Sequence, residues 1–531
     1  MRTTGYLVYI LLSFLSSIET SFSQKSDLAT DARQAMLYAT RFMVEKVSTR
    51  GGYVRLYLPD FSRRWAELET YKSQIAIRTS GTTDMGNLFL DCYNTTGDEY
   101  YYEAAEKAVS ALISGQLPCG GWDYIIDFAG VSSLKEWYNT IGKNAWGWDE
   151  YNHYYGTGTH KQNTTEAARF LLRMYLQKLD PKFKPALEKA IGFFVVSQYP
   201  LGGWPQRYPL KYDYPYKENR DYTSFYTFND DITWENIEFL VQCYATLGEA
   251  RLLDPIRRGM NFSLVTQQGN PQGGWAEQYD MGLKPANGRR YEPASLATHQ
   301  TYRQVMLLMR FYQFTGDRKF LARIPHAIKW LESSRLPDDK TEGGKYTHPY
   351  FVEVGTNRPI YAHRKGTRLQ DGQYWIDYND DNPLLHYGAK VRLDINHLKE
   401  EYAKVDALTP EEATRNSPLK VGRYKGLNSP QEYFLPDYAT VKASDEKAVR
   451  TVIGSLDDQH RWLSKNEWVS RPYTISATGV EANTAPFSTE GGEQIRDSTN
   501  QQYISTQVYL ANMKLLDSYI SSLKKDKTTG L

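Results

Sequence analysis

Apolar residues recur at helical spacing through most of the chain between residues 30 and 350. The segment 163–198, NTTEAARFLLRMYLQKLDPKFKPALEKAIGFFVVSQ, contains two runs with apolar residues at i, i+3 and i+4, separated by a polar break at Asp180-Pro181. The segments 83–114, 231–265 and 298–333 repeat this design, with Thr-Gly-Asp or a similar polar sequence after the first run. The pattern predicts a series of helix pairs, each joined by a short turn.

A Gly-Gly-aromatic sequence separates these helix pairs and recurs about every seventy residues, which indicates one supersecondary unit used repeatedly. The copies are Gly51-Gly52-Tyr53, Gly120-Gly121-Trp122, Gly202-Gly203-Trp204, Gly273-Gly274-Trp275 and, in degraded form, Gly343-Gly344-Lys345. A glutamine precedes three of them, at Gln116, Gln198 and Gln267. We expect the glycines to end the second helix of each pair, because glycine adopts the left-handed cap conformation. We expect the aromatic residues to form the walls of a cleft, since loops of one type emerge at the same end of a stacked array.

Helix hairpins in series stack into a curved array, so the predicted fold is all-α dominated, an (α/α) toroid or barrel. The repeat array spans about residues 30–350. The region 351–525 begins with alternating residues typical of short β segments and returns to helical periodicity at 440–465 and 500–524. We expect this C-terminal region to pack on the array and to close the toroid. No Gly/Ser-rich linker separates it, so residues 24–531 are predicted to form a single domain.

The N-terminus has the pattern of a secretory signal peptide. Arg2 precedes the apolar run Tyr6–Leu15, and Ser21-Phe22-Ser23 provides a small-x-small cleavage site. The run is shorter than a membrane span, and no later segment of the sequence approaches the apolar length of one. We therefore expect residues 1–23 to be removed, and the mature chain to be secreted or periplasmic without a membrane span.

Charge and composition narrow the range of partners. Lys and Arg number 63 against 62 Asp and Glu, and a net charge of +1 gives no basis for nucleic-acid binding. The cysteines Cys92, Cys119 and Cys243 are too few for a disulfide framework and lack zinc-site spacing. Cys92 and Cys243 lie in apolar helical patterns and are expected to be buried. The 42 Tyr and 12 Trp, with the tyrosines clustered in loops, favour stacking platforms for sugar rings over a plain tyrosine-rich surface.

Two adjacent carboxylates precede the third predicted helix pair, in the stretch YTFNDDITWENI. Asp230 and Asp231 follow Asn229, and the pattern has two readings that weigh about equally. The side chains either cap the helix that follows or supply oxygen ligands to a hard cation such as Ca²⁺.

Arginines gather in the loops expected at the same end. Arg289 and Arg290 stand with Glu292 in a loop bracketed by Pro285 and Pro293. Three further arginines lie in loops or predicted strands: Arg207, Arg358 and Arg364. Rigid arginines suit bidentate capture of carboxylates. An aromatic cleft with arginines and a cation site predicts an anionic polysaccharide as the substrate.

Four stretches, QYPLGGWPQRYPL, TFNDD, GRRYEPASL and GTNRPI, resemble the motifs of the family 10 pectate lyases, the pectic acid lyase family. They occur in that family's order, over about residues 155–380. The resemblance implies an (α/α) toroid, an exported enzyme and cleavage of polygalacturonate by Ca²⁺-assisted β-elimination. It also implies that Arg289 is the catalytic base, Asp230 a calcium ligand and Arg358 a substrate-binding arginine.

The remaining candidates are assigned around this match. Asp231 is interpreted as a second metal ligand. The side chains interpreted as contacting substrate, besides Arg358, are those of Arg364, Arg207, Glu292, His160 and Trp204. His160 marks a departure, because the resemblance places it where the family has an aspartate, and imidazole is a poor calcium ligand. The N-terminal third, with GGYVRLY, departs as well.

Other functions fit parts of the pattern. A glycoside hydrolase on the same fold would need two carboxyl groups, which Asp230 or Asp231 with Glu292 could provide. A non-catalytic polysaccharide-binding relative would retain Arg358 and the aromatic residues. Terpene cyclases share Gln and Gly-x-Trp repeats, but the export signal, the arginine-rich loops and the missing Asp-x-Asp-Asp motif argue against them. The reaction product separates lyase from hydrolase, because only elimination leaves an unsaturated sugar.

Overall fold

The computed structural model describes residues 28–78, 80–141, 156–211, 221–365, 373–384, 389–420, 445–470, 473–476, 479–482, 494–497 and 500–528. The predicted signal peptide lies outside these ranges. Helix pairs follow one another along the chain, as the apolar periodicity predicts. Their first helices are α2 (Thr82–Thr96), α6 (Thr165–Lys178), α8 (Ile232–Leu247) and α10 (Thr298–Thr315). Their second helices are α3 (Glu99–Ser114), α7 (Lys184–Val196), α9 (Leu253–Thr266) and α11 (Ile324–Ser333).

The turn within each pair has the chemistry that the sequence indicates. Gly97, Gly248 and Gly316 end the first helices in the left-handed conformation, and Leu179 takes the same place in α6. Asp98 then accepts a hydrogen bond from the amide of Tyr100 and begins α3. The helix stops read from Thr-Gly-Asp are therefore confirmed.

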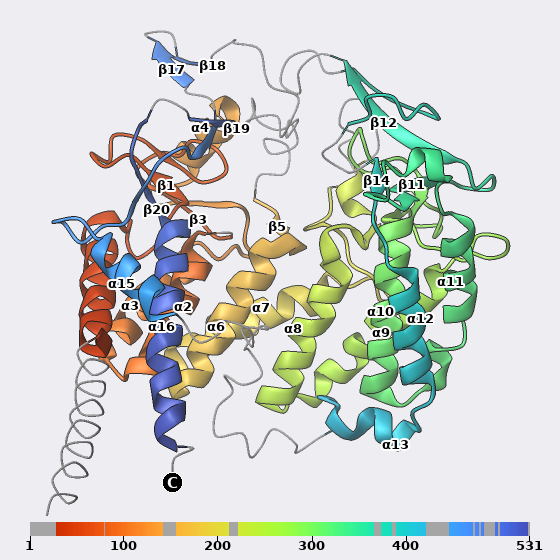
Figure 1. Cartoon of the computed structure of the whole chain (residues 1–531), viewed down its shortest axis with the longest axis horizontal. Coiled ribbons are helices and arrows are strands. Elements are labelled where there is room, and N and C mark those ends of the chain that lie inside the picture. Colours follow the sequence, from red (N-terminus) through yellow and green to blue (C-terminus); the bar gives the residue numbers. More distant parts are fainter. Residues whose placement is uncertain are drawn as a thin grey trace, which may run out of the picture.

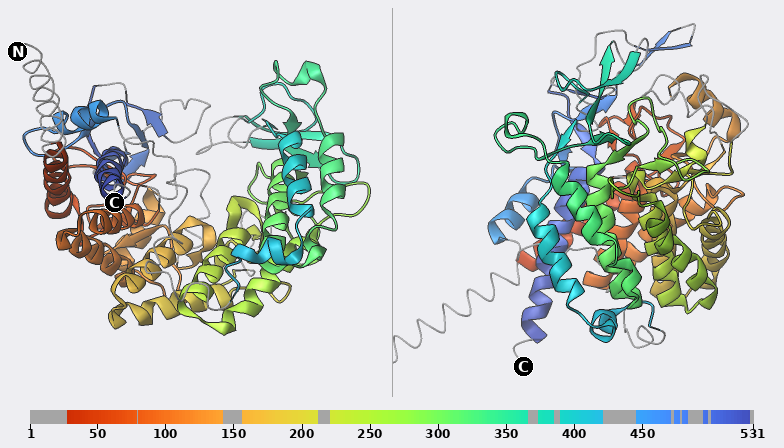
Figure 2. Two further views of the ribbon diagram at one scale, coloured as in Figure 1. Left: turned by 60° about the horizontal axis from the view of Figure 1, so that its bottom comes forward. Right: turned by 90° about the vertical axis from the view of Figure 1, so that its right-hand side faces the viewer.

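The pairs are arranged as an arc (Figure 2, left). α6 contacts α2 on one side and α8 on the other, and a helix over residues 28–42 stands before the first pair. One hydrophobic core runs through the array, from Leu28 to Ile520, and the predicted burial of Cys92 and Cys243 within it is confirmed.

Short antiparallel ladders cover one end of the array, which lies at the top of Figure 1. Each joins a strand before a first helix to a strand that follows a Gly-Gly-aromatic turn or its equivalent. The ladders are β3 (Gln74–Ala76) with β4 (Ile125–Asp127), β5 (Gly158–Thr159) with β6 (Arg207–Tyr208), β7 (Tyr226–Thr227) with β8 (Gln278–Tyr279), and β9 (Ser295–Ala297) with β11 (Phe351–Glu353). The loops of one type thus meet at one end, as expected from the repeat.

The Gly-Gly turns do not end the second helices, so that prediction is wrong. The second helices α3 and α7 end at Ser114 and Val196, several residues before the glycines. The first glycine of a turn instead lies against the backbone of the next unit's second helix. A Cβ on Gly202 would lie 2.0 Å from the carbonyl oxygen of Arg258 in α9, and Gly202 has φ +108°. Glycine is required here by close approach as well as by its backbone conformation.

The tryptophans of these turns are core residues, so the predicted aromatic walls of a cleft are not formed by them. Trp122, Trp204 and Trp275 are fully buried. Each indole N–H donates to a carbonyl near the end of the preceding second helix, that of Leu112, Phe194 or Ser263. A buried indole with its N–H satisfied in this way locks the turn onto its own unit.

The C-terminal region divides between the two ends of the arc. β11, β12 (Pro359–Lys365) and β13 (Gln373–Asp377) form a sheet with β9, in the order β13-β12-β11-β9. α12 (Ile395–Asp406) and α13 (Pro410–Ala413) pack on α10. The short β segments expected in this part of the chain are confirmed.

The last segment returns to the first helix pair. α16 (Thr506–Thr528) packs on α2 and on α15 (Glu446–Gly454). β15 (Leu463–Ser464), β20 (Tyr503–Ser505), β1 (Leu56–Tyr57) and β2 (Arg64–Trp65) form a sheet in that order. α12 and α16 therefore lie at opposite ends of the arc (Figure 2, left), and the residues described form an open arc instead of the closed toroid that we expected.

The remaining elements are short. The helical ones are α4 (Val131–Thr140), η1 (Met43–Val47), η3 (His160–Thr164), η4 (Pro181–Phe183), η5 (Tyr222–Ser224), η6 (Asn229–Asp231), η7 (Ala250–Leu252), η8 (Arg318–Phe320), η9 (Asp338–Lys340) and η11 (Thr414–Asn416). The strands are β10 (His348–Pro349), β14 (Lys390–Val391), β16 (Trp468–Ser470), β17 (Tyr473–Ser476), β18 (Gly479–Ala482) and β19 (Gln494–Arg496). Within the part of the chain described, none of the helices combines the length and the apolar character that crossing a membrane requires.

Candidate active site

The Asn229–Asp231 turn links strand β7 to helix α8. Both Asp230 and Asp231 adopt left-handed conformations, with φ of 55° and 63°. Asp231 is the N-cap residue of α8, yet its side chain makes no capping hydrogen bond. Left-handed backbone at two successive non-glycine residues is uncommon. The capping interpretation of the aspartate pair is therefore wrong.

Arg289 is held by carboxylates on two elements. Its Nη1 lies 2.7 Å from Glu292 Oε1, and its Nη2 lies 3.6 Å from Asp230 Oδ2. The backbone N–H of Arg289 donates to Glu292 Oε2 at 2.7 Å, and Asn229 Nδ2 donates to Glu292 Oε1 at 3.1 Å. The side chain of Glu292 is only 3 % exposed and that of Arg289 14 %. The structure thus brings together Asp230, Arg289 and Glu292, three residues that the sequence singled out.

A second charged group lies beside the first and was not anticipated from the sequence. Arg303 of α10 pairs with Asp231, and His299 Nε2 lies 3.0 Å from Glu277 Oε1. Burial raises the pKa of Asp231, with Asp230 adding to the effect and Arg303 opposing it. Burial likewise raises the pKa of Glu277. Glu277 has a signal in the sequence, because it follows Trp275 by two residues and so lies at the entrance of β8.

The acidic residues of the first helical turns face a similar environment. Glu166 in α6 and Glu235 in α8 each follow a buried threonine by two residues. Burial, and then the neighbouring carboxylate of Asp84, raises the pKa of Glu166 to about 8. Burial, and then the neighbouring carboxylates of Asp231 and Glu238, raises the pKa of Glu235 to about 7, although Arg169 opposes the shift.

The described residues around Asp230 and Asp231 do not fit a calcium centre. Within the described ranges, no three His, Cys, Asp or Glu side chains gather as metal ligands. The carboxylate of Asp231 is bound by Arg303 and that of Glu292 by Arg289, so guanidinium groups occupy the oxygens that a cation would need. Calcium takes six to eight oxygen ligands, which include backbone carbonyls and waters, and these side chains alone do not complete such a set.

The arginines of the C-terminal sheet lie at opposite ends of strand β12. Arg364 pairs with Tyr374 of β13, whose ring lies 5.9 Å from that of Tyr291 in the Arg289 loop. Cross-strand partners share a face of the sheet, so Arg364 lies on the face directed toward that loop. Arg358 is exposed at the turn between β11 and β12, with its guanidinium carbon 3.4 Å from the ring centroid of Tyr378.

Arg207 belongs to the neighbouring ladder, β5 with β6. Its Nη1 lies 3.3 Å from Asp123 Oδ1 and donates to Thr157 Oγ1 at 3.3 Å. Asp123 also accepts a hydrogen bond from the hydroxyl of Tyr138 at 2.7 Å. Arg207 is therefore paired with a buried carboxylate one unit away from Arg289.

His160 is a core residue, and its predicted contact with substrate is wrong. It is fully buried, with its ring 4.6 Å from that of Phe193. Its Nε2 lies 2.9 Å from Ser197 Oγ, which already donates to the carbonyl of Phe193, so Nε2 carries the proton. Its Nδ1 accepts from the amide of Asn236 at 3.0 Å. Burial lowers the pKa of His160 to about 3, which keeps the imidazole neutral.

The repeat explains why residue 160 lies in the apolar core. The backbone N–H of His160 donates to the carbonyl of Gln206, two residues after Trp204, and that of Phe228 donates to the carbonyl of Glu277, two residues after Trp275. His160 and Phe228 are thus equivalent, and both are buried. Trp204 is buried too, so its predicted contact with substrate is wrong for the same reason.

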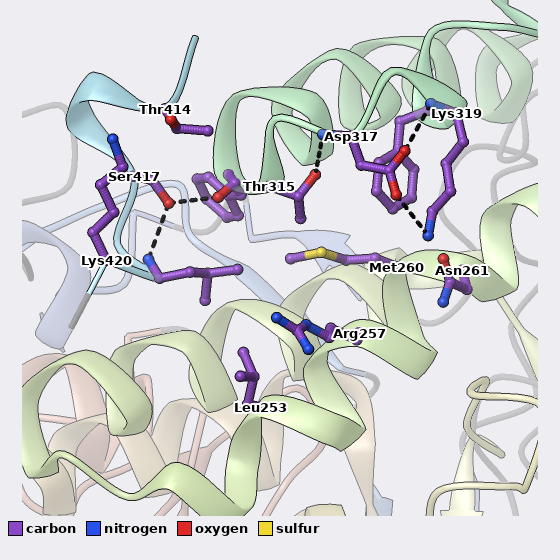
Figure 3. A pocket seen from close by; sticks show the side chains of 13 residues that line it. Leu253, Arg257, Met260, Asn261, Thr315, Asp317, Lys319, Thr414, Ser417 and Lys420 are labelled. Atoms are coloured by element: carbon purple, nitrogen blue, oxygen red, sulfur yellow. Dashed lines mark hydrogen bonds and ion pairs between the residues drawn. The ribbon is translucent and has the colours of Figure 1, made fainter. Parts of the chain in front are cut away.

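A cavity lies at the opposite end of the array (Figure 3). It has a volume of about 480 Å³ and lies between the start of α9, the end of α10 and the segment that follows α13. Arg257, Lys319 and Lys420 surround an apolar floor that includes Met260. It shares no residue with the group around Arg289.

The residues around Arg289 lie in a part of the chain that matches a known family. Residues 133–375, a little under half of the chain, match the sequence model of the pectic acid lyase family. This part of the chain is similar to the pectic acid lyases, a family of polysaccharide lyases. The match includes the Asn229–Asp231 turn, the Arg289 loop and strand β12.

Solved structures provide further comparisons at low identity. A family 10 polysaccharide lyase variant from Cellvibrio cellulosa in complex with trigalacturonic acid is 19 % identical, with a TM-score of 0.34 over 54 % of this chain and 87 % of that one. Cellobiose 2-epimerase from Spirochaeta thermophila is 13 % identical, with a TM-score of 0.39 over 64 % and 75 %. The GH76 α-mannanase from Bacteroides thetaiotaomicron is 8 % identical, with a TM-score of 0.37 over 94 % and 97 %. No curated protein matches the sequence at a significant level.

Proposed function

We propose that the protein is an exported lyase that cleaves an acidic, pectic polysaccharide, polygalacturonate in the first instance, by β-elimination. The observation that carries the proposal is the position of Arg289, whose guanidinium is fixed between Glu292 and Asp230 inside the region that matches the pectic acid lyase family. Residues 24–531 act as one catalytic domain in this proposal.

Elimination from a 4-linked uronate begins at C5, whose proton is acidified by the adjacent carboxylate. The base removes this proton, the electron pair forms the C4–C5 double bond, and the C4–O bond breaks with departure of the next sugar. We assign the base role to Arg289 and the binding of substrate carboxylates, on different rings of the polymer, to Arg364 and Arg358. Guanidinium groups directed at a developing enolate stabilise the charge as it forms.

The base role makes a physical demand on Arg289. Carboxylates beside a guanidinium favour its charged form, and arginine holds its proton strongly even without them. A deprotonated guanidine is therefore scarce at neutral pH, and the elimination rate is expected to rise with pH through the alkaline range. A rate that levels off near neutral pH would instead assign Arg289 the role of a charged stabiliser.

The pectic acid lyase family typically uses Ca²⁺. Because the described residues do not fit a calcium centre, no step above passes through one. If formation of the unsaturated product requires calcium, a cation completes the site with oxygens from groups other than these residues. If the product still forms in the presence of a chelator, the arginines neutralise the substrate's carboxylates.

The hydrolase alternative receives less support from the geometry. Glu292 accepts hydrogen bonds on both carboxylate oxygens, one of them from the Arg289 guanidinium. Both oxygens of this carboxylate are engaged by Arg289, so neither is directed at a leaving group, as a glycoside hydrolase requires of one member of its pair.

The test is the ultraviolet absorbance of unsaturated uronates, measured with the purified chain and polygalacturonate, with and without Ca²⁺ or chelator. We expect the absorbance to rise and Arg289→Ala to reduce the rate by about 10³-fold or more. New reducing ends without absorbance would establish a hydrolase. Binding without any reaction would establish a binding protein.

A further inference from the structure

The β3–β4 ladder occupies the same place in the first units of the array as the β7–β8 ladder does in the later ones. Arg78 follows the end of β3 by two residues, as Asn229 follows the end of β7. Tyr124 follows Trp122 by two residues, as Glu277 follows Trp275. Arg78 and Tyr124 are therefore the repeat equivalents of Asn229 and Glu277. Their side chains meet, with the guanidinium carbon 5.5 Å from the ring centroid.

A cavity of about 350 Å³ opens at this second position. Its lining comes from the first units and from the last part of the chain, and none of it falls in the region that matches the pectic acid lyase family. The lining residues are Arg55, Ala66, Glu67, Ala76, Arg78, Tyr124, Glu467, Trp468 and Gln507. The volume falls within the range of about 300–1,000 Å³ that is typical of small-ligand sites.

Two ion pairs supply the polar groups of this cavity. Arg78 Nη2 lies 2.8 Å from Glu67 Oε2, and Arg55 Nη1 lies 3.6 Å from Glu467 Oε2. Arg55 also donates from Nε to the carbonyl of Ala66 at 3.3 Å, and from Nη2 to the carbonyl of Trp468. These side chains are mostly buried and so hold their positions. The cavity thus presents paired donors and acceptors whose formal charges cancel.

An exposed aromatic residue is among those that line the cavity. Trp468 in β16 is 46 % exposed. The backbone carbonyl of Trp468 accepts a hydrogen bond from Arg55. This contact does not involve the indole ring. Aromatic faces with fixed polar groups beside them suit a ligand with an apolar ring face and a polar rim.

We propose that this cavity is a saccharide-binding site for pyranose rings, separate from the Arg289 site. The face of Trp468 stacks on the C–H face of a sugar ring, and the Arg–Glu pairs bind adjacent hydroxyl groups. A polysaccharide chain has repeated rings and can be held here while another part of it reacts. Binding of sugar at this site does not depend on the elimination reaction.

The test uses the full chain with Arg289→Ala, which prevents turnover. Two probes are titrated by calorimetry, hexagalacturonate and the 1,4-linked galactohexaose that lacks its carboxylates. We expect hexagalacturonate to bind at two sites and galactohexaose at one. Adding Trp468→Ala should weaken the shared binding event by about tenfold or more, the scale of a tryptophan at the centre of an interface. Glu467→Gln should weaken it less, because the shape of the cavity is kept.

Trp375→Ala is the matched control, since Trp375 is 44 % exposed in strand β13 at the other end of the arc. It should leave the galactohexaose event unchanged. In a second outcome, galactohexaose does not bind to the Arg289→Ala chain, and Trp468→Ala removes one of the two hexagalacturonate binding sites. This result would support the site and show that it recognises the carboxylate of the sugar.

Equal binding by parent and Trp468→Ala, or no binding of either probe to the parent, would overturn the proposal. Thermal unfolding of each variant separates loss of the site from loss of the fold. Absence of elimination by the wild-type chain would bear on the proposed function alone.

Discussion

The β5–β6 and β7–β8 ladders have one backbone plan and hold different chemistry. In each, a strand before a first helix pairs with a strand after a Gly-Gly-Trp turn, and the next backbone N–H donates to the carbonyl two residues beyond the tryptophan. The first ladder places neutral His160 in the core at this point. The second places Phe228 there and, immediately after it, the turn that carries Asp230 toward Arg289. The comparison teaches that the repeat supplies the frame and that the residues after the strand decide whether a unit carries a site.

Gly202→Ala disturbs the packing of a Gly-Gly-Trp turn on the next unit, a feature of the backbone plan that both ladders share. It should have the largest effect on the stability of the fold. The added Cβ meets the backbone of α9 at 2.0 Å, and φ of +108° strains any side chain. We expect the free energy of unfolding to fall by about 3 kcal/mol or more, measured by urea denaturation. Gly97→Ala is the control, because a Cβ there meets no atom within 4 Å and only the backbone strain remains. Equal losses in the two variants would contradict the close-approach argument.

Glu292→Gln should impair the site beside the β7–β8 ladder while leaving the helix array folded. The amide keeps the size of the side chain but loses the ionic bond that fixes the Arg289 guanidinium at 2.7 Å. We expect the elimination rate at saturating substrate to fall by about 10²-fold, the usual cost of a misplaced catalytic group. The unfolding midpoint should change little. A loss confined to the Michaelis constant would show that Glu292 contributes to binding alone.

His160→Gln, beside the β5–β6 ladder, should change how the stability of the fold depends on acidic pH. The pKa of His160 is about 3 in the folded chain and about 6.5 when unfolded. The unfolded state therefore binds more protons between these values. The stability that neutral His160 contributes is present above about pH 6.5 and is lost as the pH falls toward 3, by about 1.4 kcal/mol per pH unit.

The measurement is the free energy of unfolding between pH 4 and pH 7. The glutamine variant should lack this part of the slope, because its amide does not titrate. A variant with the wild-type slope would mean that other groups account for the acid sensitivity.

Glu166→Gln should have the opposite pH dependence. Burial raises the pKa of Glu166 to about 8, so the folded state binds more protons than the unfolded state between about pH 4.5 and 8. Stability is thus lost as the pH rises through this range. Relative to the wild type, the variant should gain about 1.4 kcal/mol per pH unit as the pH rises from about 4.5 toward 8, measured by thermal unfolding, and little at or below pH 5. A gain that is equal at pH 5 and pH 8 would point to packing instead of charge.

Much of the frame could be read from the sequence, because helix pairs depend on local periodicity and on turn residues such as Gly97 and Gly316. The roles of Gly202 and Trp204 could not, because they depend on partners in the next unit and in the preceding helix. His160 was misplaced for a related reason, since aligning it within the repeat pairs it with Phe228, a core position. The expected closure of the toroid required knowledge of where α12 and α16 pack.

The candidate site was partly accessible from the sequence. Loops of one type meet at one end of a repeat array, and this brings Asp230, Arg289 and Glu292 together. Glu277, His299 and Arg303 were missed because one follows a strand-entry turn and the others lie within a helix that reads as ordinary amphipathic sequence. The calcium interpretation of Asp231 could not foresee Arg303, which is distant in sequence and bound to it in the structure.

The contact of each Gly-Gly turn with the following unit gives the array a direction during synthesis. The turn at Gly202 rests on α9, and that at Gly120 rests on α7, so each turn stays incomplete until about sixty further residues have left the ribosome. Among the residues described, Gly343 and Gly344 have no neighbour within 4 Å of an added Cβ, and Lys345 stands where the tryptophan would be. The degraded copy is therefore the terminus of the series, a turn with no successor to dock against it.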